Sequence, residues 1–247
     1  MLDKTAEYHK MAEAETVFWW YRALHYRILH EIIRNFGQNK DIRILDSGCG
    51  TGGLMLFLRN KGYTNITGFD LSDLALDFCE QLKLNVSKQD IFNYADIHED
   101  SLYDVIVNSD VLCYIEWERH TKIIPDLQKM LKSGGLLLVN LPAFNIFKGE
   151  HDIAVGLLRR YNIKMVRGFF PTARIYCWPF LLSPVILISR LLQKVRLVLK
   201  LAHGNSSDVK TPIFLINNIF YGLCKFEINH LRFRNWGSSI FVTIKKA

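Results

Sequence analysis

Apolar residues along the chain alternate between strand-like and helix-like spacing. Short apolar runs predict strands at 42–46, 65–70, 84–88, 103–109 and 135–141, and periodic segments predict helices at 53–61, 72–82 and 119–132. Strands that alternate with helices in this way pair in parallel and carry helices on both faces of a sheet. The pattern therefore predicts an α/β, Rossmann-like fold with a mostly parallel sheet.

Segments outside this alternation extend the predicted architecture. Residues 4–16 and 23–36 have helical character, and residues 179–235 are rich in Leu, Ile and Phe, which predicts further helices. The β-branched run 239–245 predicts a closing strand. The expected organisation is an N-terminal helical lid (1–39), a core (40–178), a helical insertion (179–236) and the last core strand (237–247).

The most informative segment is Ile44–Gly53, I-L-D-S-G-C-G-T-G-G, which joins a predicted strand to a predicted helix. Gly48, Gly50 and Gly53 satisfy G-x-G-x-x-G, and such a loop lets a ligand approach the backbone closely. Asp70 ends the next predicted strand, where a carboxylate can accept hydrogen bonds from both ribose hydroxyls. The arrangement predicts an adenosine-containing cofactor.

Two cofactor classes fit this loop, a nicotinamide dinucleotide and S-adenosylmethionine. Asp46 lies two residues before Gly48, where its negative charge would repel a diphosphate. S-adenosylmethionine has no phosphate and carries an ammonium and a sulfonium, which a nearby carboxylate attracts. We therefore expect S-adenosylmethionine, and an NAD-dependent oxidoreductase is the weaker alternative.

Composition narrows the class further. The net charge of +7 is modest, and the five cysteines show neither C-x-x-C nor zinc spacing, which predicts free thiols, a reducing cytoplasmic setting and no metal site. The N-terminus has no apolar signal segment. The longest apolar stretch contains Pro179 and Pro184 and is too short for an ordinary transmembrane helix.

Five sequence blocks resemble class I S-adenosylmethionine-dependent methyltransferases, in order and spacing, over residues 40–142. They are I-L-D-S-G-C-G-T-G-G, G-F-D-L-S, Gln89-Asp90, Y-D-V-I-V-N-S-D-V-L and L-K-S-G-G-L-L-L-V-N. F-W-W-Y-R (18–22) and H-D-I-A-V-G-L-L-R-R-Y (151–161) resemble elements of a bacterial small-molecule subgroup. Phe18 and Leu157 stand where that subgroup usually has His, and Leu112-Cys113-Tyr114-Ile115 replaces its usual L-E-H-[IL].

The resemblance implies a seven-stranded sheet with an antiparallel last strand, and cofactor contacts by position. Asp46, Gly48, Cys49 and Gly50 would line the methionine end, and Asp70 with Leu71 would hold the ribose and the adenine edge. Asp90 with Ile91 would meet the adenine, and Ser109 to Val111 would close the site. An Asp that follows a strand, as Asp90 does, is also often a helix cap, which is the alternative interpretation of this residue.

Residues on the acceptor side are weaker candidates. His151 follows the fifth predicted strand and is the candidate general base, assisted by Asp152 or Tyr161. The candidate acceptor contacts are Trp19, Trp20, Arg22, Tyr114 and Arg160. Each also has a structural interpretation: the aromatic block could pack the lid onto the sheet, His151 could fix a loop, and the arginine could pair with a carboxylate.

We therefore expect methyl transfer to an oxygen or nitrogen of a small hydrophobic, natural-product or glycan-type acceptor. No N-P-P-[YF]-like motif stands at Asn108–Val111, so nucleic acid is not an expected partner. Residues 179–201 are apolar with interleaved Lys and Arg, which suits a buried cap, a lipophilic cleft, a helix on anionic lipid or a homodimer face. A non-catalytic cofactor-binding or membrane-associated protein is the alternative.

Overall fold

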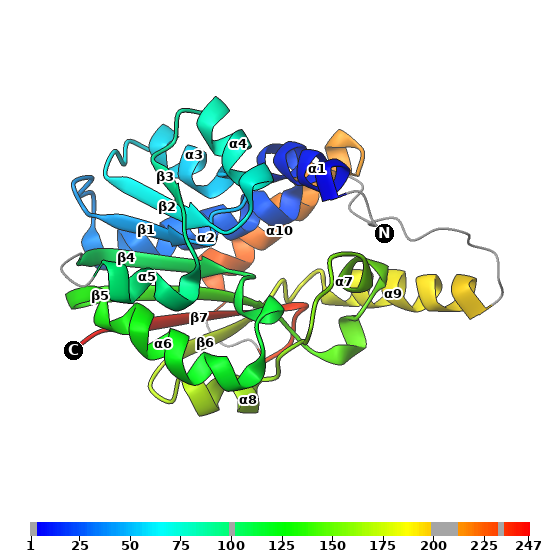
Figure 1. The fold of residues 1–247 in the computed structure, drawn as a ribbon. Coiled ribbons are helices and arrows are strands. Elements are labelled where there is room, and N and C mark those ends of the chain that lie inside the picture. Colours follow the sequence, from blue (N-terminus) through cyan, green and yellow to red (C-terminus); the bar gives the residue numbers. More distant parts are fainter. Residues whose placement is uncertain (1–3, 99–101, 199–211, 232–234) are drawn as a thin grey trace.

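The strands form a single sheet that confirms the predicted fold class. A computed structural model describes residues 4–98, 102–198, 212–231 and 235–247 (Figure 1). Within these residues the sheet has seven strands in the order β3-β2-β1-β4-β5-β7-β6. The strands are β1 (Ile44–Ser47), β2 (Ile66–Asp70), β3 (Val86–Lys88), β4 (Tyr103–Ser109), β5 (Leu131–Pro142), β6 (Arg174–Trp178) and β7 (Ser239–Lys245). Strand β7 runs antiparallel to both of its neighbours, and the first five strands pair in parallel.

Helices follow the strands as the apolar pattern predicts, with two differences. The elements are α3 (Gly53–Asn60), α4 (Asp73–Gln81), α5 (Ile91–Ile97), η1 (Leu112–Tyr114), η2 (Trp117–Arg119), α6 (His120–Lys129), η3 (Asn145–Phe147), α7 (Glu150–Ala154) and α8 (Ile163–Phe169). Helix α5 was not predicted; Asp90 caps it by accepting from the Phe92 amide at 3.0 Å. Strand β5 begins at Leu131 rather than 135, because Leu131 pairs with Tyr103 ahead of a register shift.

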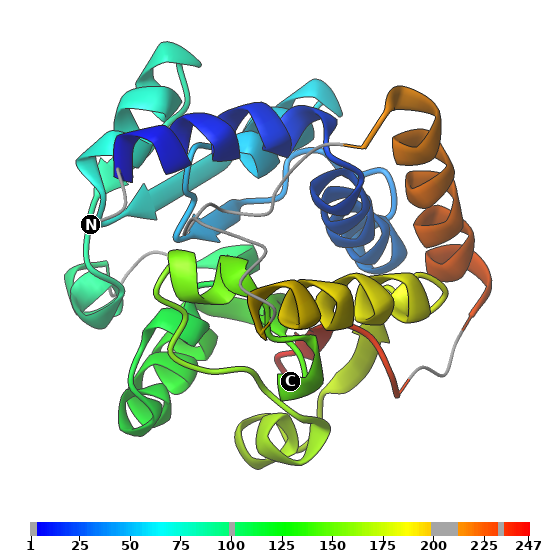
Figure 2. The ribbon, with the colours of Figure 1, turned by 90° about the vertical axis from the view of Figure 1, so that its right-hand side faces the viewer.

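Four further helices lie outside the alternation of strands and helices. They are α1 (Lys4–Val17), α2 (Trp19–Phe36), α9 (Ser183–Val198) and α10 (Phe214–His230). Helix α10 packs along α2, and α1 crosses α3 and α4 at the glycine loop. Helix α9 contacts η3 and projects from the body of the molecule beside α7 (Figure 1). Seen from the side in Figure 2, α1 and α9 lie on opposite sides of the region into which the parallel strands end.

Apolar side chains fill two layers, one on each face of the sheet. The burial of all four residues of β1 follows from its central position, because both of its faces are covered. All five cysteines are buried and free, as predicted. In the described part of the chain, no helix is long and apolar enough to cross a membrane, and no group of three or more His, Cys, Asp or Glu is placed to hold a metal ion.

Candidate active site

The glycine loop is drawn tightly against the end of β2. The amides of Gly48 and Cys49 both donate to the Phe69 carbonyl, each at 2.9 Å. Gly48 has a φ of +81°, and a Cβ there would overlap the Val111 side chain that follows β4. The ends of β1, β2 and β4 are therefore held together, and only glycine fits at position 48.

Asp70 connects the two loops that surround the predicted ribose position. Its Oδ2 accepts from the Gly50 amide and its Oδ1 from the Ser72 amide, each at 3.0 Å. A carboxylate has about four acceptor positions, so these two bonds leave capacity for ribose hydroxyls. The loop geometry thus orients Asp70 without exhausting it.

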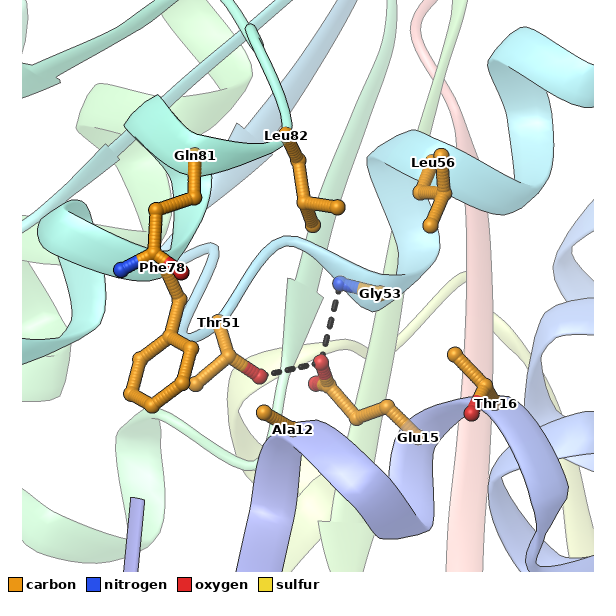
Figure 3. Close-up of a pocket in the computed structure, with 9 residues that line it drawn as sticks. All are labelled: Ala12, Glu15, Thr16, Thr51, Gly53, Leu56, Phe78, Gln81 and Leu82. Carbon is orange, nitrogen blue, oxygen red and sulfur yellow. Dashed lines mark hydrogen bonds between the residues drawn. The ribbon is translucent and has the colours of Figure 1, made fainter. Parts of the chain in front are cut away.

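Glu15 is a site residue that the sequence did not reveal. It lies on α1, and its carboxylate accepts from the Gly53 amide at 2.9 Å and from the Thr51 hydroxyl (Figure 3). A Cβ at position 53 would lie only 2.5 Å from Glu15 Oε2, so Gly53 is what permits the approach. Ala12, Phe78 and Leu82 line a pocket of about 150 Å³ beside this contact, between α1, α3 and α4.

Carboxylates gather around the glycine loop. Burial raises the pKa of Glu15 to about 7, despite the hydrogen bonds from Thr51 and Gly53. Burial raises the pKa of Asp46 well above its usual range, and the negative charges of Glu15 and Asp70 raise it further. Buried like charges of this kind fit a cationic ligand and disfavour a diphosphate. These carboxylates therefore fit the ammonium and sulfonium of S-adenosylmethionine.

Asp110, directly after β4, is a fourth carboxylate in addition to Glu15, Asp46 and Asp70. It has a φ of +56°, a conformation uncommon outside glycine. Asn140 on β5 holds it twice: the Asn140 carbonyl accepts from the Asp110 amide at 2.9 Å, and its Nδ2 donates to Asp110 Oδ2 at 2.8 Å. Trp178 Nε1 donates to Asn140 Oδ1 at 2.9 Å, which fixes the orientation of the amide.

Electrostatics link Asp110 to the glycine loop. Burial raises the pKa of Asp110 to about 7, while Asn140 and Arg160 oppose the shift. Burial also raises the pKa of Tyr21, and the charges of both Glu15 and Asp110 add to it, so Tyr21 lies within reach of both carboxylates. Burial raises the pKa of Tyr114 as well, and the charges of Asp110 and Tyr21 add to this shift. The charge of Asp110 therefore acts on both Tyr21 and Tyr114.

The remaining predicted cofactor residues lie around the same strand ends. Leu71 is exposed after β2, and Ile91 packs against the core at the start of α5. Asp90 Oδ1 accepts the capping hydrogen bond from the Phe92 amide, and the residue remains partly exposed. The Ser109 hydroxyl is buried without a hydrogen-bond partner among the described residues, which leaves it available to a ligand.

The predicted catalytic residues divide into one half-buried histidine and two structural side chains. Asp152 forms a buried bidentate pair with Arg160, with Nε and Nη2 at 2.8 and 2.9 Å. Burial would raise the pKa of Asp152, but Arg160 more than offsets this and holds it low. Tyr161 is buried, with its hydroxyl bonded to His120 Nε2 at 2.8 Å and to the Leu112 carbonyl at 3.0 Å. Both contacts hold loops in place, and His151 sits on α7, beyond β5.

Four of the five predicted acceptor contacts, Trp19, Trp20, Arg22 and Arg160, have partners within the chain. Trp19 packs against Phe220 of α10, and the Arg22 guanidinium lies 4.1 Å from the Tyr221 ring centroid. Trp20 stacks on Trp178 with ring centroids 5.4 Å apart. Arg160 Nη1 donates to the carbonyls of Ala143 and Ser238. Of the five, Tyr114 is the one whose pKa the charge of Asp110 raises, and Tyr21, between the predicted residues Trp20 and Arg22, is affected by Asp110 in the same direction.

Comparison with known proteins agrees with this geometry. Residues 19–174 match the family model described as a methyltransferase domain. The methyltransferase srdJ of Neurospora crassa is 27% identical over 74% of this chain and 84% of its own length. The putative methyltransferase YqeM of Bacillus subtilis is 32% identical, over 40% of this chain and 42% of its own. A SAM-dependent methyltransferase from Archaeoglobus fulgidus has the same fold, with a TM-score of 0.54, 17% identity and coverage of 90% and 94%.

The chain belongs to the methyltransferase domain family, because the family model spans more than half of its length. Membership of this family identifies S-adenosylmethionine as the cofactor, as Asp46 and the glycine loop predicted. The alternative of an NAD-dependent oxidoreductase is therefore wrong.

Proposed function

We propose that this protein transfers a methyl group from S-adenosylmethionine to an oxygen or nitrogen of a small, hydrophobic acceptor. When bound, the cofactor supplies a methyl group already activated by its positive sulfur. The chain contributes binding and orientation: Asp46 and Glu15 attract the positive charges, and Asp70 binds the ribose. Its F-W-W-Y-R and H-D…R-R-Y segments support a place in the bacterial small-molecule subgroup, and its buried free thiols suit the cytoplasm.

The observation that carries the proposal is the placement of Asp110 among the ends of β1, β2 and β4. A nucleophile that must lose a proton needs an acceptor near neutral pH, and a carboxylate with a pKa of about 7 suits this role. Among the described residues, Asp110 Oδ1 has no hydrogen-bond partner, while Oδ2 is held by Asn140. We assign Oδ1 as the atom that takes the acceptor's proton, with Tyr21 and Tyr114 flanking the acceptor.

His151 remains the second candidate base. It lies after β5, and β4 separates β5 from β1 in the sheet, so it is one strand further from the glycine loop than Asp110. Asp152 and Tyr161 enter the proposal as positioning residues, because Arg160 and His120 engage them.

Substitution distinguishes the two candidates. We expect Asp110→Asn to lower kcat by about 100-fold or more, the usual contribution of a general base, and to leave binding of S-adenosylhomocysteine intact. His151→Ala is the matched comparison. The measurement is release of S-adenosylhomocysteine over a panel of amines and phenols of increasing hydrophobicity.

Full turnover of Asp110→Asn together with an inactive His151→Ala would assign the base to His151. Cofactor binding without product release from any acceptor would favour the alternative of a non-catalytic cofactor-binding protein.

A further inference from the structure

Helix α9 carries an apolar stripe that no described part of the chain covers. Val185, Ile188, Leu192 and Val195 recur at helical spacing, and each is about half exposed, from 49% to 58%. At the start of α10, the N-cap residue Ile213 and the first two helical residues, Phe214 and Leu215, are also exposed, and Phe214 is 83% exposed. Isolated apolar side chains on a surface are ordinary, but a periodic stripe marks an interaction surface.

Helix α9 lies next to the segment that carries His151, the second candidate base. Helix α9 contacts η3, and the Arg190 guanidinium lies so close to Gly149 that a Cβ there would come within 2.5 Å of Nη1. Gly149 begins the short helix that carries His151. Ile146 and Ile153 of this same η3–α7 segment are also exposed, at 44% and 68%. Helix α9, with its apolar stripe, is thus in contact with the η3–α7 segment, which carries His151.

The charge of the segment that contains α9 and the start of α10 indicates which kind of partner this surface would bind. Residues 179–226 contain six Lys or Arg and one acidic residue, Asp208. The basic residues are Arg190, Lys194, Arg196, Lys200, Lys210 and Lys225, of which the structure describes the side chains of Arg190, Lys194 and Lys225. An apolar helical stripe with basic residues beside it suits a bilayer with anionic lipids, which attract each nearby Lys or Arg. A symmetric dimer would instead bring two basic copies of the same surface together.

We propose that α9 and the start of α10 dock this protein on an anionic membrane surface. Docking there brings the η3–α7 segment, which carries the second candidate base His151, close to the lipid. The acceptor would then belong to the class of apolar molecules that partition into a bilayer, a conclusion that rests on the proposed function.

Vesicle flotation tests the docking directly. We expect the full chain to bind phosphatidylglycerol vesicles at least tenfold more strongly than phosphatidylcholine vesicles, and to be released by 0.5 M salt. The double variant Ile188→Glu/Leu192→Glu should lose about tenfold in binding, because both side chains would leave the apolar layer. Lys194→Glu, which keeps the apolar stripe, should weaken binding to the anionic vesicles. Ile97→Glu, at an equally exposed apolar position on α5, should bind as the unaltered chain does.

Absence of binding to phosphatidylglycerol vesicles would overturn the proposal, as would equal binding to both lipids. A dimer that the double variant dissociates, with no vesicle binding, would assign the surface to a second copy of the chain. Flotation requires neither cofactor nor turnover. Its failure with intact binding of S-adenosylhomocysteine would therefore overturn the docking alone, whereas loss of cofactor binding would count against the proposed function.

Discussion

At the scale of single residues, the site is dominated by buried carboxylates that form no salt bridge with the described residues, although the charge of Arg160 acts on Asp110. Glu15 and Asp110 both have pKa values of about 7, chiefly because burial penalises their charged forms. A cationic cofactor would compensate these charges. We therefore expect cofactor affinity to increase as pH rises through 7.

Glu15 also makes the stability of the ligand-free protein depend on pH. Its pKa is raised from 4.5 to about 7, so the folded state holds the proton more tightly than the unfolded state. The resulting stabilisation is complete below pH 4.5 and is lost as pH rises through 7, a change of at most roughly 3 kcal/mol. Glu15→Gln removes this titration. Its melting temperature relative to the unaltered chain should therefore rise by several degrees between pH 5 and pH 8.

Glu13→Gln is the matched control, because Glu13 is exposed on the same helix. Parallel melting profiles for Glu15→Gln and the unaltered chain would contradict burial of the Glu15 carboxylate.

At the scale of elements, α10 holds the junction between α1 and α2. The Asn217 side chain accepts from the Trp19 amide at 2.9 Å and donates to the Val17 carbonyl at 2.7 Å. It thereby satisfies two backbone groups where the helices meet. Asn217→Ala would leave both without this partner, and we expect a loss of about 2–4 kcal/mol in unfolding free energy. Chemical denaturation measures it.

Asn229→Ala is the control for that experiment. Asn229 lies on the same helix and bonds the Tyr26 hydroxyl at an exposed position, so its loss should cost under about 1 kcal/mol. Equal effects of the two substitutions would show that α10 does not hold the junction.

At the scale of the molecule, local sequence predicted the sheet better than it predicted the site. The parallel strands and Asp70 follow from apolar runs and a glycine loop, which are signals within about 30 residues. Glu15 contacts Thr51 across 36 positions of the chain, and no local pattern marks that contact. Asp110 lay inside the segment Ser109–Val111 expected to close the site, yet its orientation depends on Asn140 and Trp178, which are distant in the sequence.

The same limit explains the acceptor residues. The sequence suggested that the adjacent aromatics 18–21 could not share one face, but it could not say which of them faces the site. That choice depends on α10, whose residues Asn217, Phe220 and Tyr221 engage Trp19 and Arg22, while the charges of Glu15 and Asp110 act on Tyr21.

Calorimetric titration with S-adenosylmethionine and S-adenosylhomocysteine, with NADH as the comparison ligand, tests the central claim most directly. The account predicts micromolar binding of both sulfur compounds, no binding of NADH, and loss of binding in Asp70→Ala. It also predicts unchanged binding in Asp73→Ala, because Asp73 is exposed on α4 and pairs with Lys88. Binding of NADH in place of the sulfur compounds, or full affinity in Asp70→Ala, would contradict the account.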